Sequence, residues 1–375
     1  MSKIIDNDQP SLSRRVLDAF RLDPILTALL FFLSLFGLLI LYSASGSDQG
    51  MLIRQLTRLG LALALMVVIA NVSLRLLKKL SFLFYLAALL MLLAVMGYGE
   101  VGKGAQRWLD LGFIRFQPSE LMKLAMPMML ASYLSDKVLP VGWKDLLFSV
   151  VLVIVPVLLI AKQPDLGTSL LVASAGFFVM FLAGVRWKII FILGLLASLM
   201  APLLWKFALH DYQRGRILTL LNPESDPLGS GYHIIQSKIA IGSGGTYGKG
   251  WLNGTQSQLD FLPERSTDFI FSVFGEEFGL FGVSLLILLY LLIIYRGLFI
   301  SACAVDNYGR LLAGALSLTF YVYLFVNTGM VTGLLPVVGV PLPLVSYGGT
   351  SMVTLMMGFG MIMAVRSSKR FLAST

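Results

Sequence analysis

The stretch ILTALLFFLSLFGLLILYSA, residues 25–44, decides the fold class because it contains no charged side chain. A hydrocarbon core about 30 Å thick needs about 20 apolar residues for each helical crossing, so this run is long enough to span a membrane. It is also longer than the apolar core of a signal peptide, which runs to about 15 residues. The run therefore predicts an uncleaved first membrane span.

The composition of the whole chain agrees with a membrane protein. Of its 375 residues, 57% are hydrophobic and 13% are charged, whereas a soluble domain carries about a quarter charged residues. Nine further apolar runs of similar length follow the first. They lie near residues 54–72, 79–97, 118–134, 146–162, 166–184, 187–208, 269–295, 310–332 and 350–366. The sequence thus predicts an all-α polytopic membrane protein with ten transmembrane helices.

An even number of spans places both ends of the chain on one side of the membrane. Basic residues concentrate on the cytoplasmic side of membrane proteins, which assigns residues 1–24 and 367–375 to cytoplasmic tails flanking a membrane domain at 25–366. The same rule explains the formal charge of +9 without nucleic acid as a partner. Several basic residues nevertheless fall in outside loops, which suggests an anionic ligand. They include Arg107, Arg214, Arg216, Lys249 and Arg265.

Three segments depart from the pattern of simple spans. Residues 98–117 and the large loop 209–268, between spans seven and eight, lie outside the membrane in this topology. The large loop has amphipathic pieces, so we expect it to be ordered over the membrane face. Residues 336–349 are apolar but broken by prolines and glycines, which is tolerated at membrane depth only where protein or a wet cavity satisfies the backbone.

Several common catalytic and binding motifs are missing. The Gly-rich stretch GSGGTYGKGW at 242–251 matches neither the Walker nor the dinucleotide pattern, and is typical of a tightly turned loop. Two histidines without a recognised spacing and the single Cys303 argue against a dedicated zinc or thiolate site. No GxSxG serine motif is present.

Buried charges are the next candidates. Glu120 and Lys123 are three residues apart in the fourth run, so they share a helix face and can pair. Ionisable groups inside a span usually mark a functional path, but a structural ion pair that locks helices together is an equal alternative. Glu276 and Glu277 in the eighth span raise the same question, and we expect one of them to find a basic or backbone partner.

Two aspartates stand where helices begin. Asp165, in KQPDLGTS, is typical of a turn residue or helix cap. Asp268 directly precedes the eighth run, where a carboxylate is expected to cap the helix. Glu264 and Arg265 lie close to Asp268 in sequence, so the three also predict a charged cluster at the lip of the bundle that could read an amphiphilic substrate.

Five of these segments together carry a family resemblance. They are GAQRWLDLGFIRFQPSE at 104–120, QPDLGTS at 163–169, HDYQRGRILTLLNPESDPLGSGYHIIQSKIAIGSGG at 210–245, GTQSQLDFLPERSTDFIF at 254–271 and LPVVGVPLPLVSYGGTS at 335–351. The sequence resembles the SEDS family of shape, elongation, division and sporulation proteins, most closely its elongation branch. The similarity extends over about residues 24–366.

The resemblance implies a peptidoglycan glycosyltransferase that polymerises lipid II, a polyprenyl-linked disaccharide pentapeptide, at the outer face of the bacterial cytoplasmic membrane. It implies that Asp268 is the essential loop aspartate, for which we expect the role of general base. The expected supporting residues are Glu120, Lys123, Arg107, Asp165, Arg214, Arg216, Lys249, Glu264 and Arg265. A divalent cation, Mg²⁺ or Mn²⁺, is compatible with a pyrophosphate leaving group, but no protein site for it is evident.

The resemblance also implies partners, namely the growing glycan strand, membrane lipids and a class B penicillin-binding protein. Two other functions fit parts of the sequence. A flippase for the lipid-linked precursor would use the same buried ions and the broken segment 336–349, although no matching interrupted helix occurs in the first half. A non-catalytic scaffold for the penicillin-binding protein would leave the outside charges without an obvious use.

Overall fold

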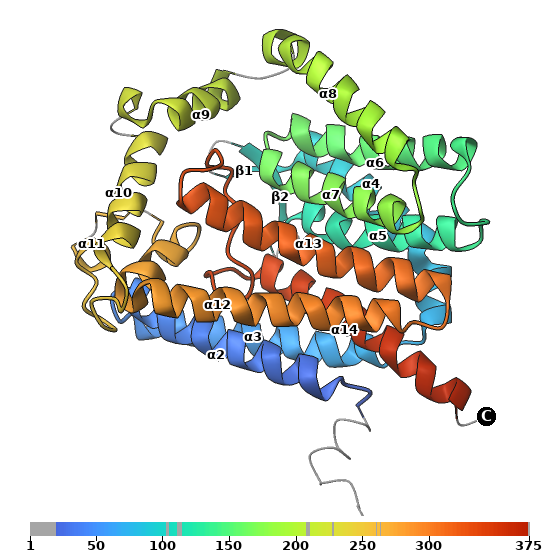
Figure 1. The fold of residues 1–375 in the computed structure, drawn as a ribbon, viewed down its shortest axis with the longest axis horizontal. Coiled ribbons are helices and arrows are strands. Elements are labelled where there is room, and N and C mark those ends of the chain that lie inside the picture. The colour runs from blue at the N-terminus through green and yellow to red at the C-terminus, as the bar shows by residue number, and fades with distance from the viewer. Residues whose placement is uncertain are drawn as a thin grey trace, which may run out of the picture.

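The computed structural model describes residues 20–102, 105–110, 115–207, 211–226, 229–259, 261–262 and 264–373. Long helices dominate it, and Figure 1 shows most of them packed side by side in one bundle. Each of the ten predicted spans coincides with a helix. These are α2 (Pro24–Ala44), α3 (Gln49–Ala70), α4 (Leu74–Tyr98), α5 (Pro118–Ser135), α6 (Trp143–Lys162), α7 (Leu166–Leu182), α8 (Trp187–Phe207), α12 (Ile270–Ala302), α13 (Asn307–Val331) and α14 (Thr350–Ala373).

Within the described residues, seven of these helices are long and apolar enough to cross a membrane, namely α2, α3, α4, α6, α12, α13 and α14 as far as Ser368. Large apolar side chains face outward from them, among them Phe31, Phe82 and Leu158, each more than 60% exposed. Such surfaces are stable in lipid and not in water. The chain is therefore a helical multi-pass membrane protein.

The ends of the helices follow from local sequence. The Oδ1 atom of Asp23 accepts a hydrogen bond from Leu26 N at 2.7 Å, and Pro24 occupies the first helical position of α2. Asp48 caps α3 in the same way. The last helix, α14, continues to Ala373, so the helix extends beyond the predicted span end at 366.

The prediction of an all-α fold is wrong for residues 98–117. This segment forms a three-stranded antiparallel sheet from β1 (Glu100–Gly102), β2 (Ala105–Asp110) and β3 (Arg115–Phe116). The strands are two to six residues long, too short for a hydrophobic alternation to be visible against the neighbouring spans. Their cross-strand hydrogen bonds satisfy backbone groups that a short loop at the bundle edge would otherwise expose.

The large loop is ordered in its described parts, as expected. It contains α9 (Asp211–Leu221), the 3₁₀ turn η1 (Pro223–Ser225), α10 (Ser230–Ser243) and α11 (Thr255–Gln258). Figure 1 shows α8 and α9 at the periphery, whereas α10 and α11 lie beside the first turns of α12. The Oγ atoms of Ser237 and Ser272 lie 2.9 Å apart and join α10 to α12.

The Gly-rich stretch 242–251 has a structural use in this arrangement. Helix α12 is kinked at Gly279, whose φ of 62° and ψ of −165° are not helical. The Gly-rich stretch runs alongside this kink: Leu280 N donates to Gly245 O at 2.9 Å, and Lys249 N donates to Glu276 O at 3.0 Å. A Cβ on Gly248 would lie 2.1 Å from Glu277 O, so only glycine allows this approach. The interpretation as a tightly turned loop is confirmed.

The broken segment 336–349 enters the bundle as irregular backbone, and its polar groups are satisfied by protein. Asn327 Nδ2 donates to Val340 O at 2.8 Å, and Tyr290 OH donates to Pro343 O at 2.6 Å. Ser346 Oγ accepts from Leu342 N at 2.8 Å. These bonds are the protein partners that irregular backbone at membrane depth requires, so this expectation is confirmed.

Candidate active site

Asp268 lies where the large loop meets the segment 336–349. Asn327 Nδ2, on α13, donates to the carbonyl of Asp268 at 2.9 Å and to that of Val340 at 2.8 Å, so one amide group joins the two segments. A Cβ on Gly339 would lie 3.6 Å from Oδ2 of Asp268, which places the carboxylate directly over this glycine. The carboxylate is half-buried. Its position is thus determined by α13 and by the broken segment.

The loop before Asp268 is attached to the broken segment at two further points. Tyr347 N donates to Ser266 O at 2.8 Å, and Ser346 Oγ donates to Thr267 O at 2.6 Å. Asn327, Ser346 and Tyr347, which are far from this loop in sequence, therefore hold the backbone carbonyls of three successive loop residues. The backbone that carries the carboxylate of Asp268 is thus constrained.

The prediction that Asp268 caps the eighth span is wrong. The N-cap position of α12 is Phe269, without a side-chain hydrogen bond, and the helix begins at Ile270. The reason is the turn at 264–269, in which Phe269 N bonds to Glu264 O at 3.3 Å and places Asp268 before the cap position. A capping role therefore does not explain the carboxylate of Asp268.

Glu264 and Arg265 lie in the same turn as Asp268, so the three form the charged cluster that the sequence predicted. Glu264 is exposed and accepts a 2.8 Å hydrogen bond from Thr267 Oγ1. Arg265 reaches back to the carbonyl of Ser257. Glu264 also has a positive φ of 53°, a conformation that requires the surrounding loop to hold it.

His233, on α10, stacks on Phe269 with ring centroids 5.5 Å apart. Burial lowers the pKa of His233 below its ordinary value, and the carboxylates of Glu264 and Asp226 oppose that shift. The imidazole next to the loop is therefore neutral at pH 7. It serves as an aromatic wall beside the turn that carries Asp268.

The predicted pair of Glu120 and Lys123 forms inside the bundle. Lys123 Nζ lies 2.6 Å from Glu120 Oε1, and both residues are about 95% buried. Thr354 Oγ1, on α14, donates to the other carboxylate oxygen at 2.9 Å, and Lys123 Nζ lies 4.9 Å from the ring centroid of Tyr323 on α13. The pair thus connects α5 to both helices.

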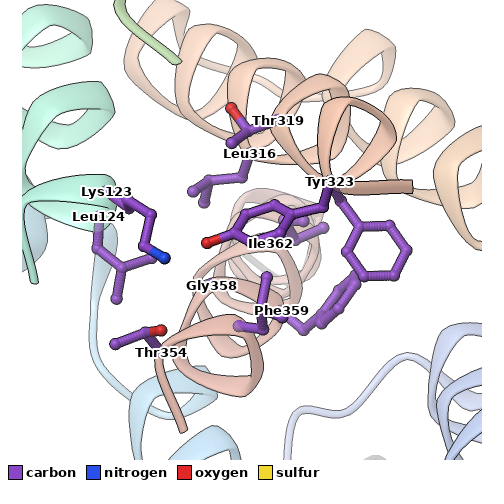
Figure 2. A pocket seen from close by; sticks show the side chains of 11 residues that line it. Lys123, Leu124, Leu316, Thr319, Tyr323, Thr354, Gly358, Phe359 and Ile362 are labelled. Atoms are coloured by element: carbon purple, nitrogen blue, oxygen red, sulfur yellow. The ribbon is translucent and has the colours of Figure 1, made fainter. Parts of the chain in front are cut away.

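A small cavity of about 30 Å³ adjoins this pair. Figure 2 shows the nitrogen of Lys123 pointing toward the hydroxyl end of Tyr323, with Thr354 below and Phe359 opposite. The volume suits about one or two water molecules, and the polar atoms of Lys123, Tyr323 and Thr354 are suitable partners for them. The Glu120–Lys123 pair can therefore contact water or exchange a proton with it, in addition to holding the helices together.

Asp165 caps α7, as predicted, because its Oδ1 accepts from Thr168 N at 3.2 Å. The same carboxylate receives Gln117 Nε2 at 2.8 Å and lies 3.9 Å from the guanidinium of Arg107. Arg107 also donates to the carbonyl of Gln163 at 3.2 Å. Arg107, on strand β2 of the small sheet, is thereby attached to the first turn of α7.

The first turn of α7, which follows Asp165, and the carboxylate of Asp268 both lie next to the short stretch Val338–Val340. A Cβ on Gly167, in the first turn of α7, would lie 2.8 Å from Val338 O. Gly339 faces Asp268, and Val340 packs with Tyr323 in an apolar cluster. Asp165, Asp268 and the Glu120–Lys123 pair next to Tyr323 were predicted separately from sequence. In the structure all three lie near this one stretch of backbone.

The sequence analysis missed two arginines near this site, Arg54 and Arg58 on α3. The guanidinium of Arg58 lies 4.7 Å from the ring centroid of Tyr347, and Arg54 Nε donates to the Tyr347 hydroxyl at 3.4 Å. Tyr347 in turn bonds to the loop at Ser266. The available signal was a pair of arginines four residues apart at the outer end of the second span, because charges there face the bundle or the interface.

Other predicted residues lie apart from Asp268. Lys249 Nζ is 2.7 Å from the buried Glu276 and 2.7 Å from Thr255 Oγ1, so it neutralises a carboxylate at the kink of α12. The expectation that one of the two span glutamates finds a basic partner is confirmed. Arg214 and Arg216 are half-buried on α9, at the periphery of the molecule.

A dedicated metal centre finds no support in the side chains. Over the described ranges, which omit residues such as His210 and Asp260, no group of three or more His, Cys, Asp or Glu side chains is close enough to hold an ion.

Comparison with known proteins shows the family of this chain. The model of the FtsW, RodA and SpoVE family, described as "Cell cycle protein", matches residues 23–371. The chain belongs to this family. The "Peptidoglycan glycosyltransferase MrdB" of Escherichia coli K12 is 51% identical over 358 residues, covering 96% of this chain and 97% of the relative. "Stage V sporulation protein E" of Bacillus subtilis is 35% identical and covers 93% and 98%.

Solved structures of family members share the fold. The rod shape determining protein RodA of Thermus thermophilus superimposes with a TM-score of 0.70 at 31% identity, covering 92% of this chain and 96% of that one. A chain from a study of "polymerization and crosslinking by a peptidoglycan synthase complex" gives 0.80 at 36% identity, covering 92% and 97%. The fold of this family member is thus that of RodA.

Proposed function

We propose that the chain is a peptidoglycan glycosyltransferase that polymerises lipid II at the outer face of the cytoplasmic membrane during cell elongation, with Asp268 as the general base. The observation that carries the proposal is the position of the Asp268 carboxylate. Asn327, Ser346 and Tyr347 hold its loop by the backbone, and the carboxylate lies over Gly339 of the broken segment. The 51% identity to an E. coli peptidoglycan glycosyltransferase supports the reaction class.

The reaction needs a base and a cationic pocket. The acceptor sugar's hydroxyl is a weak nucleophile, and a carboxylate that takes its proton lowers the barrier by about 3 to 5 kcal/mol, or 10²- to 10⁴-fold in rate. Direct displacement at the anomeric carbon converts an α-linked donor into a β-linked product. We therefore expect inversion, with no covalent sugar intermediate.

The leaving group is undecaprenyl pyrophosphate, whose developing negative charge needs cations. Arg54 and Arg58 are suited to this role because they lie beside Tyr347, which is bonded to the Asp268 loop. Arg107 and Lys123 lie near the stretch Val338–Val340. A divalent cation brought by the pyrophosphate itself would add to the same charge.

The topology proposed for this function has ten crossings, with both termini in the cytoplasm and residues 209–268 outside. The ten helices that coincide with the ten apolar runs support it. Both substrates carry prenyl tails, so a lipid-facing bundle would hold their headgroups at a fixed depth. The likeness to a peptidoglycan synthase complex that couples polymerisation with crosslinking supports a class B penicillin-binding protein as partner.

The first test is purified protein with lipid II in detergent, where no compartments exist. A polymerase forms glycan chains there, whereas a flippase or a scaffold forms none. We expect polymer on addition of lipid II, and more of it when the transpeptidase partner is added. Absence of polymer with and without the partner, from protein that elutes as a single species, would exclude the enzyme function.

The double substitution Arg54→Gln/Arg58→Gln tests the pyrophosphate contact. We expect polymerisation at limiting lipid II to fall by at least about 30-fold, because two charge-assisted contacts are lost and each is worth about 1 kcal/mol or more. The matched control is Arg186→Gln/Lys188→Gln, which removes the same charge from an exposed turn at the other end of the bundle. Equal rates for the two double variants would remove Arg54 and Arg58 from the site.

A further inference from the structure

A second cavity lies at the end of the bundle opposite Asp268. Its volume is about 570 Å³, within the usual range of ligand pockets. Helix α3 runs from Arg54, beside Tyr347, to the cavity beyond Ala70, and α14 runs in the same direction to Ser367. The cavity is therefore separated from the candidate active site by the full length of these helices.

The polar lining of this cavity is basic and rich in hydroxyl groups. It is formed by Arg21, Arg75, Ser73, Ser367, Ser368 and the single carboxylate of Asp306. Guanidinium and hydroxyl groups together are the donors that phosphate oxygens accept from. Two cations against one carboxylate leave a positive site for an anion.

The nearby buried carboxylate of Asp23 does not oppose an anion there. Arg296 binds it through both oxygens, at 3.1 and 2.8 Å, and Arg366 contacts it as well. These two arginines fully balance the single charge of Asp23.

The cavity also lies where the apolar surface of the helices ends. The apolar part of α14 ends at Ser368, which lines the cavity. Val68 and Leu76, 59% and 45% exposed, lie on α3 and α4 directly next to the cavity wall and face lipid. A headgroup in the cavity would leave its acyl chains along this apolar surface. Figure 1 shows the last turns of α14 extending past the neighbouring helix ends.

We propose that this cavity binds the phosphate headgroup of an anionic phospholipid of the inner leaflet. Arg21 and Arg75 hold the phosphate by charge and by charge-assisted hydrogen bonds, whereas the hydroxyls of Ser367 and Ser368 donate to the carbonyls of Ala364 and Val365 in their own helix. The site joins the α3–α4 corner, the beginning of α13 and the end of α14, so a bound lipid stabilises the packing of these helix ends. Zwitterionic lipids, with no net charge, bind it less tightly.

Native mass spectrometry of the purified full-length protein tests this proposal. Delipidated protein is titrated with phosphatidylglycerol, with phosphatidylethanolamine and with soluble glycerol 3-phosphate. We expect phosphatidylglycerol to bind at least tenfold more tightly than the other two. The variant Arg21→Gln/Arg75→Gln should weaken phosphatidylglycerol binding about 30-fold, because each basic residue contributes about a fivefold factor near an anionic lipid.

The matched control is Arg186→Gln/Lys188→Gln, two exposed cations at the same end of the bundle and outside the cavity. It should bind phosphatidylglycerol within twofold of the parent. Arg21→Lys/Arg75→Lys keeps the charge and should recover most of the affinity, which distinguishes a lost contact from misfolding. Equal weakening in the Gln variant and the control, equal affinity for phosphatidylethanolamine, or displacement by glycerol 3-phosphate at equal concentration would each overturn the proposal.

Discussion

Asp268→Asn is expected to lower the rate of lipid II polymerisation by about 10²- to 10⁴-fold while the protein remains folded. Asparagine has nearly the shape of aspartate but cannot take a proton from the acceptor hydroxyl. The bonds that hold the loop use the backbone carbonyls of Ser266, Thr267 and Asp268, so they remain after the substitution. The room over Gly339 also remains, because the side chain does not lengthen.

The measurement is the initial rate of polymer formation in detergent, with a thermal unfolding curve for each variant. Asp136→Asn makes the same chemical change at an exposed site at the other end of α5, where Asp136 pairs with Lys78. This control should polymerise at the parent rate. Polymer formed at that rate by Asp268→Asn would exclude Asp268 as the base.

Breaking the Glu120–Lys123 pair is expected to have the second large effect. Lys123→Met leaves a carboxylate that is about 95% buried without its cation, and Glu120→Gln leaves the ammonium without its anion. Loss of one partner of a buried pair costs about 3 to 5 kcal/mol. Each single variant should therefore unfold at a clearly lower temperature and lose activity.

The double variant Glu120→Gln/Lys123→Met separates a structural role from a functional one. Removing both charges eliminates the unpaired ion, so stability should return to within about 1 kcal/mol of the parent. We expect polymerisation to stay at least 100-fold below the parent, because the cation beside Tyr323 and the cavity is still missing. Recovery of both stability and activity would instead identify the pair as a structural lock between helices.

The helical architecture could be predicted from the sequence because the length and the apolar composition of each run indicate a helix that is surrounded by lipid. All ten predicted runs became helices, and their ends changed by only a few residues where caps such as Asp23 and Asp48 set them. The Glu120–Lys123 pair was likewise predictable, since residues three apart on a helix always share a face. The short sheet at 100–116 was not, because strands of two to six residues carry too little periodicity.

The contacts around Asp268 could not be predicted from the local sequence. From sequence, Asp268 fits a helix cap, but the turn at 264–269 gives that position to Phe269. Arg54 and Arg58 gave a weak signal, and only the docking of Tyr347 on the loop at Ser266 brings α3 to the site. Lys249 resembled a phosphate ligand until the fold paired it with Glu276.

For this protein, the residue pattern alone determined that the chain is a bundle of apolar helices joined by polar loops, because hydrophobic length and helical spacing are local properties. The juxtaposition of Asp268 with Gly339, Asn327 and the Asp165 cluster was decided only in three dimensions. It depends on an irregular segment, 336–349, whose backbone carries no periodic signal. Its place is set by hydrogen bonds to residues up to 293 positions away, such as Gly348 N to Gln55 Oε1.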